Sequence, residues 1–286
     1  MFEKVNPMHP DKIADRIAGA IVDLAYSKAD SPKVAVEVLV GHGTCNVTVE
    51  SSVTFEEDEL RAIVERLTYQ GIICNFVLCP QDSILAKNQE GAIRCGDNGI
   101  FRGTYTTEEQ NALTKIAKEI YKAFPTDGKY VIVKNPDSEQ ILTICQSECN
   151  NLAAVRDIVS SVIPEARMPL VRINPLGNWT GGIDVDAGAT NRKLGSDMGD
   201  AVTGGGLHGK DLSKADVTVN ICCYLAAQEY KCPVIAACSI GDTQVTIVTA
   251  NGSRITQQYH KMVERAKQFI DELGGFEAFA EWGLIR

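Results

Sequence analysis

The chain has 286 residues, of which 44% are hydrophobic and 23% charged, and its formal net charge is −9. This balance is typical of a folded globular protein and excludes disordered, collagen-like and coiled-coil chains. The acidic charge disfavours a general nucleic-acid binder, because such a protein needs a basic surface. No apolar run approaches the roughly 18 residues of a membrane-spanning helix, and the first residues have no apolar signal segment. We therefore expect a cytoplasmic protein that binds neither nucleic acid nor a membrane.

Ten cysteines are scattered along the chain, and none forms a CxxC pair or a set with metal-ligand spacing. Several lie in apolar stretches, for example Cys74, Cys145 and Cys222. In a chain without a secretory segment this pattern favours reduced core thiols over disulfides or a zinc site.

Hydrophobic periodicity predicts a similar order of elements three times along the chain. The first unit has a helix at 11–28, strands at 33–39 and 45–53, a helix at 55–70 and a strand at 74–79. The second has a helix at 107–124, strands at 130–134 and 141–145, a helix at 151–162 and a strand at 170–174. The third has a helix at 211–230, strands at 234–240 and 244–250, and a helix at 255–273.

The leading helices of these units start about a hundred residues apart, which is too long a period for a solenoid. We expect an α+β fold of three similar α/β lobes around a pseudo-threefold axis, with approximate bounds 1–88, 89–184 and 185–286 and with interleaving of lobes allowed. Several strands are apolar at consecutive positions, so both sheet faces need cover, and two helices per lobe cover only one face. A homodimer packed sheet against sheet would cover the second face of each sheet. The alternative is that the lobes cover one another within one chain.

A long stretch between the second and third units, 173–216, is rich in Gly, Asp and Lys and has little periodicity. Connections of this length in a compact domain are usually functional. Its residues 204–210, GGGLHGK, have the spacing of a Walker A phosphate loop, but Asp211 stands where that loop needs Ser or Thr. We expect only the shared physics: a glycine backbone that can approach a phosphate, and Lys210 beside a helix N-terminus that attracts anions. Trp179 in the same stretch is either a packing plug or a surface on which a base stacks.

Other polar positions have ordinary explanations when each is taken alone. Proline and aspartate in HPDK, residues 9–12, are common helix-start signals. The turns at 94–99 and 127–129 are explained by their Gly and Asx content. Glu50 lies on a polar strand face, where solvent exposure is the default. Glu37 is different, because a carboxylate in the middle of an apolar strand is costly unless it is paired or bound to a cation.

Taken together, seven motifs occur here in the order in which they occur in S-adenosylmethionine synthetases (methionine adenosyltransferases). They are HPDKIAD at 9–15, VEVLV at 36–40, RCGDNG at 94–99, DGK at 127–129, INPLG at 173–177, NRK at 191–193 and GGGLHGKDLSKAD at 204–216. The chain resembles that family over nearly its whole length, including the final FEAFAEWGLIR, and is identified as an unusually short member.

The resemblance implies an enzyme that joins the sulfur of methionine to C5′ of ATP, and then hydrolyses the released triphosphate to pyrophosphate and phosphate. It implies ATP and L-methionine as substrates, a pair of Mg²⁺ ions per site, K⁺ as an activator, and active sites shared across a homodimer, with a dimer of dimers as the larger alternative. Two other hypotheses remain. One is an ATP- or polyphosphate-hydrolysing enzyme that does not bind methionine, and the other is a non-catalytic regulatory homologue. The second alternative is disfavoured because the catalytic His, Asp and Lys positions are kept.

The resemblance also implies roles for individual residues. Catalytic roles fall to His9, Asp97, Lys129 and Lys210. ATP binding falls to His9, Asp127, Lys129, Trp179, Asp186, Arg192, Lys193 and Lys210, and methionine binding to Glu50, Gln81, Asp97, Asp186 and Lys214. The metal ligands are Asp11 and Asp216 for Mg²⁺ and Glu37 for K⁺. The charges suit these roles, because ATP brings about four negative charges into an acidic protein and needs several cations around it.

Some positions depart from the family pattern. Met8 stands where the family has glycine, Asn178 and Trp179 replace a basic residue and Phe, and Ser147 replaces a histidine. The stretch 81–97, which corresponds to the family's mobile gating loop, is short. These differences affect the gating and the nucleotide selectivity rather than the phosphate and metal positions.

Overall fold

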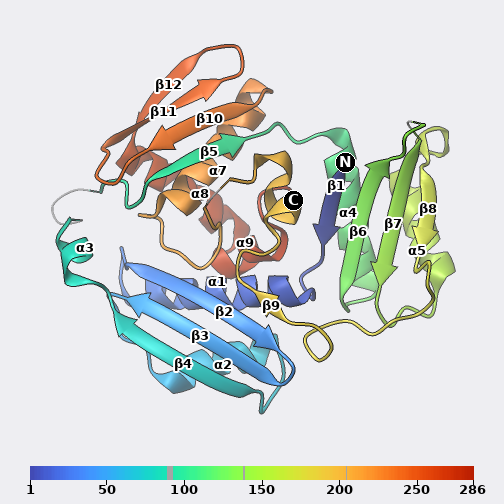
Figure 1. The fold of residues 1–286 in the computed structure, drawn as a ribbon, viewed down its shortest axis with the longest axis horizontal. Helices are drawn as coiled ribbons and strands as arrows, with labels where there is room; N and C mark the ends of the chain where they lie inside the picture. The colour runs from blue at the N-terminus through green and yellow to red at the C-terminus, as the bar shows by residue number, and fades with distance from the viewer. Residues whose placement is uncertain (89–92, 138, 204) are drawn as a thin grey trace.

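The computed structural model describes residues 1–88, 93–137, 139–203 and 205–286. It contains three four-stranded sheets, and Figure 1 shows helices α1, α7, α8 and α9 lying between them. The mixed α+β fold class predicted from the sequence is therefore confirmed. Within the described ranges, no helix combines the length and the apolar character that crossing a lipid bilayer would require.

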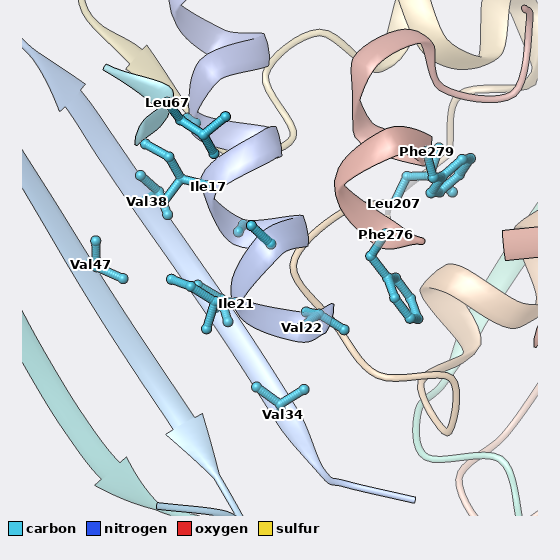
Figure 2. Packing of buried hydrophobic residues seen from close by; sticks show 14 of the residues in the cluster. Ile17, Ile21, Val22, Val34, Val38, Val47, Leu67, Leu207, Phe276 and Phe279 are labelled. Carbon is cyan, nitrogen blue, oxygen red and sulfur yellow. The ribbon is translucent and has the colours of Figure 1, made fainter. Parts of the chain in front are cut away.

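The first sheet has the strand order β4-β3-β2-β9. Its strands are β2 (Val34–Gly41), β3 (Thr44–Ser51), β4 (Ile73–Pro80) and the short β9 (Gly188–Ala189). Helices α1 (Pro10–Lys28) and α2 (Glu57–Leu67) are associated with it. In Figure 2, Ile17 and Ile21 of α1 point toward Val38 and Val47 of the sheet. Side chains alternate between the two faces of a strand, so the valines of β2 pack on α1 while Glu37 and Leu39 face away from it.

The second and third sheets each combine strands that are distant in the sequence. The second has the order β1-β6-β7-β8 and contains β1 (Phe2–Val5), β6 (Gly128–Lys134), β7 (Gln140–Gln146) and β8 (Leu170–Ile173). Its helices are α4 (Glu108–Ala123) and α5 (Leu152–Val162). The third has the order β12-β11-β10-β5 and contains β5 (Gly99–Gly103), β10 (Val234–Cys238), β11 (Gln244–Thr249) and β12 (Arg254–Gln258). Its helices are α7 (Ala215–Tyr230) and α8 (Tyr259–Leu273).

Each sheet leaves apolar side chains exposed on the face that the helices do not cover. On the first sheet these include Leu39, Ile73 and Val77, and on the third sheet Ile100 and Ile235. Leu39 and Ile235 each lie between two buried neighbours in their strand, so alternation places them on the open face of the sheet. These open faces are where a second sheet could pack.

The C-terminal segment closes the centre of the molecule. Helix α9 (Phe276–Trp282) packs along α1, and Figure 2 shows Phe276 and Phe279 on the side of α1 away from the first sheet. The buried ammonium of Lys4 donates hydrogen bonds to the carbonyl oxygens of Ser196, Trp282 and Ile285 at 2.9, 2.7 and 2.6 Å. Burial lowers the pKa of Lys4 well below its ordinary value. The remaining elements are α3 (Ser83–Asn88), α6 (Leu194–Met198) and the 3₁₀ turns at Glu165–Arg167 and Gly199–Ala201.

Two predicted elements were wrong in extent. The helix expected at 255–273 is strand β12 followed by α8, because Arg254–Gln258 pairs with β11 and Thr256 bonds Thr246 across the two strands at 2.8 Å. The helix expected at 211–230 begins at Ala215. The side chain of Asp211 accepts hydrogen bonds from the backbone N–H groups of Val34 and Ser213, which holds residues 211–213 in a turn before the helix.

Candidate functional site

The N-terminus of α1 carries the first candidate residues. His9 is the N-cap, and its Nδ1 accepts a hydrogen bond from the backbone N–H of Asp11 at 3.2 Å. Burial, followed by the positive charges of Lys129 and Lys193, lowers the pKa of His9 to about 3. The imidazole is therefore neutral, and since Nδ1 is the acceptor, the ring proton lies on Nε2. His9 can donate one hydrogen bond from Nε2.

Asp11 is buried beside His9 and is held by the segment around β9. Its Oδ1 accepts a hydrogen bond from the backbone N–H of Ala189 at 2.9 Å and lies 3.6 Å from Nη1 of Arg192. Burial raises the pKa of Asp11, while the Ala189 N–H and the Arg192 charge act in the opposite direction. Gly188 permits this approach, because a side chain there would collide with the backbone of Pro10.

A second wall of the site comes from the start of β6 and the loop after β8. The ammonium of Lys129 lies 5.7 Å from the centroid of the Trp179 ring and 3.7 Å from Oδ2 of Asp186. Asp127 is buried, and its Oδ2 accepts a hydrogen bond from the Gly182 N–H at 3.0 Å. Its Oδ1 and Nε1 of Trp179 have no partner among the described residues. This wall contains a cavity of about 320 Å³, which is lined by Lys129, Cys145 and residues 174–179.

These residues form what we call the α1 group. It comprises His9, Asp11, Asp127, Lys129, Trp179, Asp186, Arg192 and Lys193. The structure thus brings together cations, carboxylates, a neutral histidine and an aromatic ring that come from three distant parts of the sequence. Such a set can bind a polyanion that carries an aromatic base.

The N-terminus of α7 carries a second group, Asp97, Lys210, Lys214 and Asp216, which we call the α7 group. The ammonium of Lys210 donates a hydrogen bond to Oδ2 of Asp216. Lys214 is the N-cap of α7. The turn that contains Asp97 reaches this helix end, because the Gly96 N–H bonds the Ser213 carbonyl at 3.1 Å. Among the described residues, no ion pair or hydrogen bond joins a side chain of the α7 group to one of the α1 group.

The other predicted ligands lie on the first sheet. Ala35 of β2 is opposite both Glu50 of β3 and Lys210, so Glu50 and Lys210 occupy one row across the sheet. The backbone N–H of Gln81 donates to the carbonyl of Ser51, the residue after Glu50, at 3.0 Å. Part of the stretch 81–97, residues 89–92, lies outside the described residues, as does Gly204 of the glycine-rich motif.

The expectation that Glu37 is a buried charge was wrong for the single chain. Glu37 is exposed on the open face of the first sheet, because Val36 and Val38 on either side of it point into the core. The hydroxyl of Thr190 donates a hydrogen bond to its Oε2. Burial within the chain therefore does not support a K⁺ role for Glu37. That role requires a second chain to cover this face of the sheet.

A buried charged cluster beneath the α1 group had no local signal strong enough to be predicted. It consists of Lys12, Asp15, Asp197 and His208, all of them buried. The Lys12 ammonium lies 2.8 and 3.0 Å from the two oxygens of Asp197 and 3.1 Å from Asp15, and Nε2 of His208 lies 2.9 Å from Asp197. The one clue in the sequence was the Lys12–Asp15 spacing of three on a helix whose other residues are largely apolar.

The two carboxylates and the histidine of this cluster are close enough to hold a metal ion. Lys12 already supplies the cation that they need, however, and its ammonium lies among them. Burial acts to lower the pKa of Lys12, but Asp197 and Asp15 outweigh it and raise that pKa, so Lys12 stays charged. The cluster is therefore a structural ion network rather than a metal centre.

The chain is similar in sequence to proteins of known family. Residues 1–79 match the family described as S-adenosylmethionine synthetase, N-terminal domain. The chain is 27% identical to S-adenosylmethionine synthase 1 of Rhodospirillum rubrum, with 89% of this chain and 78% of the relative covered. It is 28% identical to the S-adenosylmethionine synthase of Helicobacter pylori strain G27 and 29% identical to that of Hyphomonas neptunium, each match covering 75% of this chain and 68% of the relative. The chain is similar to S-adenosylmethionine synthetases over most of its length.

The match to the synthetase N-terminal domain contains four of the candidate residues, His9, Asp11, Glu37 and Glu50. The remaining candidates lie beyond residue 79. Those residues are assigned to the site by the synthetase motifs in the sequence and by the contacts described above.

Proposed function

We propose that this chain synthesises S-adenosylmethionine from ATP and L-methionine, as the names of its relatives indicate. The observation that carries the proposal is the convergence of cations on a neutral histidine. Lys129, Lys193 and Arg192 all lie near enough to His9 to lower its pKa, and Asp11 lies beside it. A triphosphate fits among these cations, and a base fits against Trp179.

In this mechanism the sulfur of methionine attacks C5′ of ATP and the C5′–oxygen bond breaks. Negative charge grows on the departing oxygen of the triphosphate. The Nε2–H of His9 stabilises this charge more in the transition state than in the ground state, which is the requirement for faster chemistry. The low pKa suits this role, because the ring donates a hydrogen bond without giving up its proton.

The triphosphate is held by the cations of both groups, Lys129, Arg192, Lys193 and Lys210. In the same proposal Asp127 and Trp179 face the nucleoside, and the stacked Lys129–Trp179 pair joins the phosphate part of the site to the base part. Because the whole chain is acidic, the local concentration of cations is what makes a polyanion site possible.

The carboxylates Asp11 and Asp216 fit a Mg²⁺ site chemically, since carboxylate oxygens are the hard ligands that Mg²⁺ prefers. Bound Mg²⁺ would neutralise phosphate charge during bond cleavage. Glu37 would hold K⁺ on the open sheet face. These carboxylates would keep the metal in reach of the phosphates that the cations bind.

Methionine carries both a positive and a negative group, so its site needs both signs of charge. We assign it to Glu50, Gln81, Asp97, Asp186 and Lys214. Asp97 lies next to the α7 N-terminus, where it would face the sulfonium that develops on sulfur.

We further infer that two chains form a homodimer through the open sheet faces, either alone or within a dimer of dimers. The exposed apolar side chains on those faces support this inference. So does the separation of the α1 and α7 groups within one chain, because a partner's α7 group could complete the α1 group. The three sheets with their helix pairs would then be the three lobes of a pseudo-threefold fold.

The activity is tested by mass spectrometry of the products after incubation with ATP, L-methionine, Mg²⁺ and K⁺. We expect S-adenosylmethionine together with pyrophosphate and phosphate. Phosphate without S-adenosylmethionine would instead indicate an ATP- or polyphosphate-hydrolysing enzyme. If folded protein formed neither product, the synthetase assignment would be overturned in favour of a regulatory homologue.

A further inference from the structure

Asn191 connects three segments that carry the candidate site. It follows β9 and has a left-handed backbone with φ of 61°. Its backbone N–H donates to Oδ1 of Asp15 in α1 at 2.8 Å. Its side-chain Nδ2 donates to the carbonyl of His208 at 3.1 Å, and its Oδ1 accepts from the N–H of His208 at 2.8 Å. Asn191, which lies in the turn after β9, therefore binds both α1 and the glycine-rich segment 205–210.

The pair of hydrogen bonds between the Asn191 amide and the His208 backbone fixes both the distance and the orientation of the two segments. An amide that donates to and accepts from one residue imitates the paired bonds of an antiparallel ladder. Gly206 leaves room for the amide, because a Cβ there would lie 2.6 Å from Nδ2 of Asn191. His208 is only 3% exposed, so its backbone groups would lose their partners if the amide were removed.

Both segments that Asn191 connects are also hydrogen-bonded to strand β2. The Thr190 N–H donates to the carbonyl of Val38 at 3.1 Å, and the Val36 N–H donates to the carbonyl of Gly209 at 2.7 Å. Asn191 links the segments at a second point and so closes a ring of contacts. Arg192 and Lys193 directly follow Asn191, and Lys210 is two residues beyond His208. The ring therefore fixes where Arg192 and Lys193 lie relative to α1.

We propose that Asn191 is a positioning residue for the triphosphate, acting through Arg192 and Lys193. This inference rests on the proposed function, since it assumes that these cations bind the triphosphate of ATP. Reacting groups that are misplaced by about 1 Å can cost on the order of 10²-fold in rate. The amide supplies a constraint of that kind on Arg192 and Lys193 of the α1 group.

The test is Asn191→Gly, which keeps a residue suited to the left-handed backbone and keeps the N–H that binds Asp15, while removing only the amide. The matched control is Lys231→Gly, since Lys231 is also left-handed, with φ of 52°, but is exposed at the end of α7. Inorganic triphosphate with Mg²⁺ serves as the binding probe in isothermal titration calorimetry. Steady-state kinetics give kcat and the KM for methionine separately.

We expect Asn191→Gly to weaken triphosphate binding about tenfold and to lower kcat about 10²-fold, with little change in the KM for methionine. Lys231→Gly should match the unmodified protein. If Asn191→Gly binds triphosphate and turns over normally, Asn191 is not a positioning residue. A uniform loss of kcat and of methionine binding, in step with a lower Tm, would point to a purely structural role and would also overturn the proposal.

A second variant decides the question if Asn191→Gly does not fold. Gly206→Ala places a Cβ against the Asn191 amide and disturbs the same contact from the opposite side. It should show the same weakening of triphosphate binding, and normal binding by a folded Gly206→Ala protein would refute the inference. If the unmodified protein binds triphosphate but makes no S-adenosylmethionine, the proposed function fails while the positioning role can still be measured by calorimetry.

Discussion

Replacing Asp197 by asparagine removes one of the carboxylates that neutralise the buried ammonium of Lys12. Both side chains are completely buried, and two oxygens of Asp197 lie within 3.0 Å of Lys12 Nζ. Breaking such a pair from one side typically costs about 3–5 kcal/mol, because the remaining charge keeps its desolvation penalty. Asp15 still faces Lys12 in the variant, so we expect about 3 kcal/mol, a large part of the 5–15 kcal/mol typical of a folded domain.

The assay is urea unfolding followed by circular dichroism, with the exposed Asp137→Asn as the matched control. The control should change the free energy of unfolding by less than about 0.5 kcal/mol. A double-mutant cycle with Lys12→Met should show coupling, since the two charges compensate one another only when both are present. A loss in Asp197→Asn no larger than in Asp137→Asn would refute the view that the charged cluster stabilises the fold.

The same variant has a distinct pH dependence. Burial opposes ionisation of Asp197, but the charges of Lys12 and His208 outweigh it and hold the pKa of this carboxyl below its ordinary value. A carboxyl with a lowered folded-state pKa contributes stability above its unfolded pKa of about 3.9 and loses it at lower pH. The difference in unfolding free energy between the unmodified protein and Asp197→Asn should therefore be full at about pH 6 and should shrink below about pH 4. A difference that stays constant into acid would contradict the assignment.

Three further predictions concern the site and the open sheet faces. Lys210→Ala should lower synthesis on the order of 10²–10³-fold, measured by product formation, while gel filtration shows an unchanged dimer; normal turnover would remove Lys210 from the phosphate site. Glu37→Ala should weaken activation by K⁺ in steady-state assays, and an unchanged response to K⁺ would show that Glu37 is not a ligand. Val77→Glu, on a side chain that is 54% exposed on the open face of the first sheet, should shift the protein to monomer in analytical ultracentrifugation, and an unshifted dimer would place the interface elsewhere.

The sequence predicted the elements whose signal lies within one continuous segment. Helix α1 and the β2–β3 hairpin were found with bounds that differ by a few residues from those observed, because each repeats its apolar positions over many residues. Strand β9 has only two residues and exists because β2 offers an open edge, so no local pattern could reveal it. The sequence does not indicate strand β12, because its five residues carry a single strongly apolar side chain, Ile255.

In the candidate site, too, the sequence predicted residues within continuous motifs but not contacts between distant segments. The motif around His9 and Asp11 could be found in the sequence, and so could the cations Lys129 and Arg192. The buried charged cluster beneath them could not be found, because Lys12 and Asp197 are 185 positions apart and meet only in the folded chain. The exposure of Glu37 was also missed, since an apolar run does not reveal which face of its strand is covered. The sequence places Asn191 in a short motif and does not reveal its contacts with His208.

The packing of α9 on α1 has a consequence for how the chain is made. Val22 of α1 is fully buried in the native protein, and Tyr26 of the same helix stacks on Phe276, which is translated about 250 residues later. At synthesis rates of about 5–20 residues per second, roughly 12–50 s separate the two segments. During that interval one side of the first helix stays without its native cover. Helix α1 is therefore the part of the nascent chain on which we expect a chaperone to act.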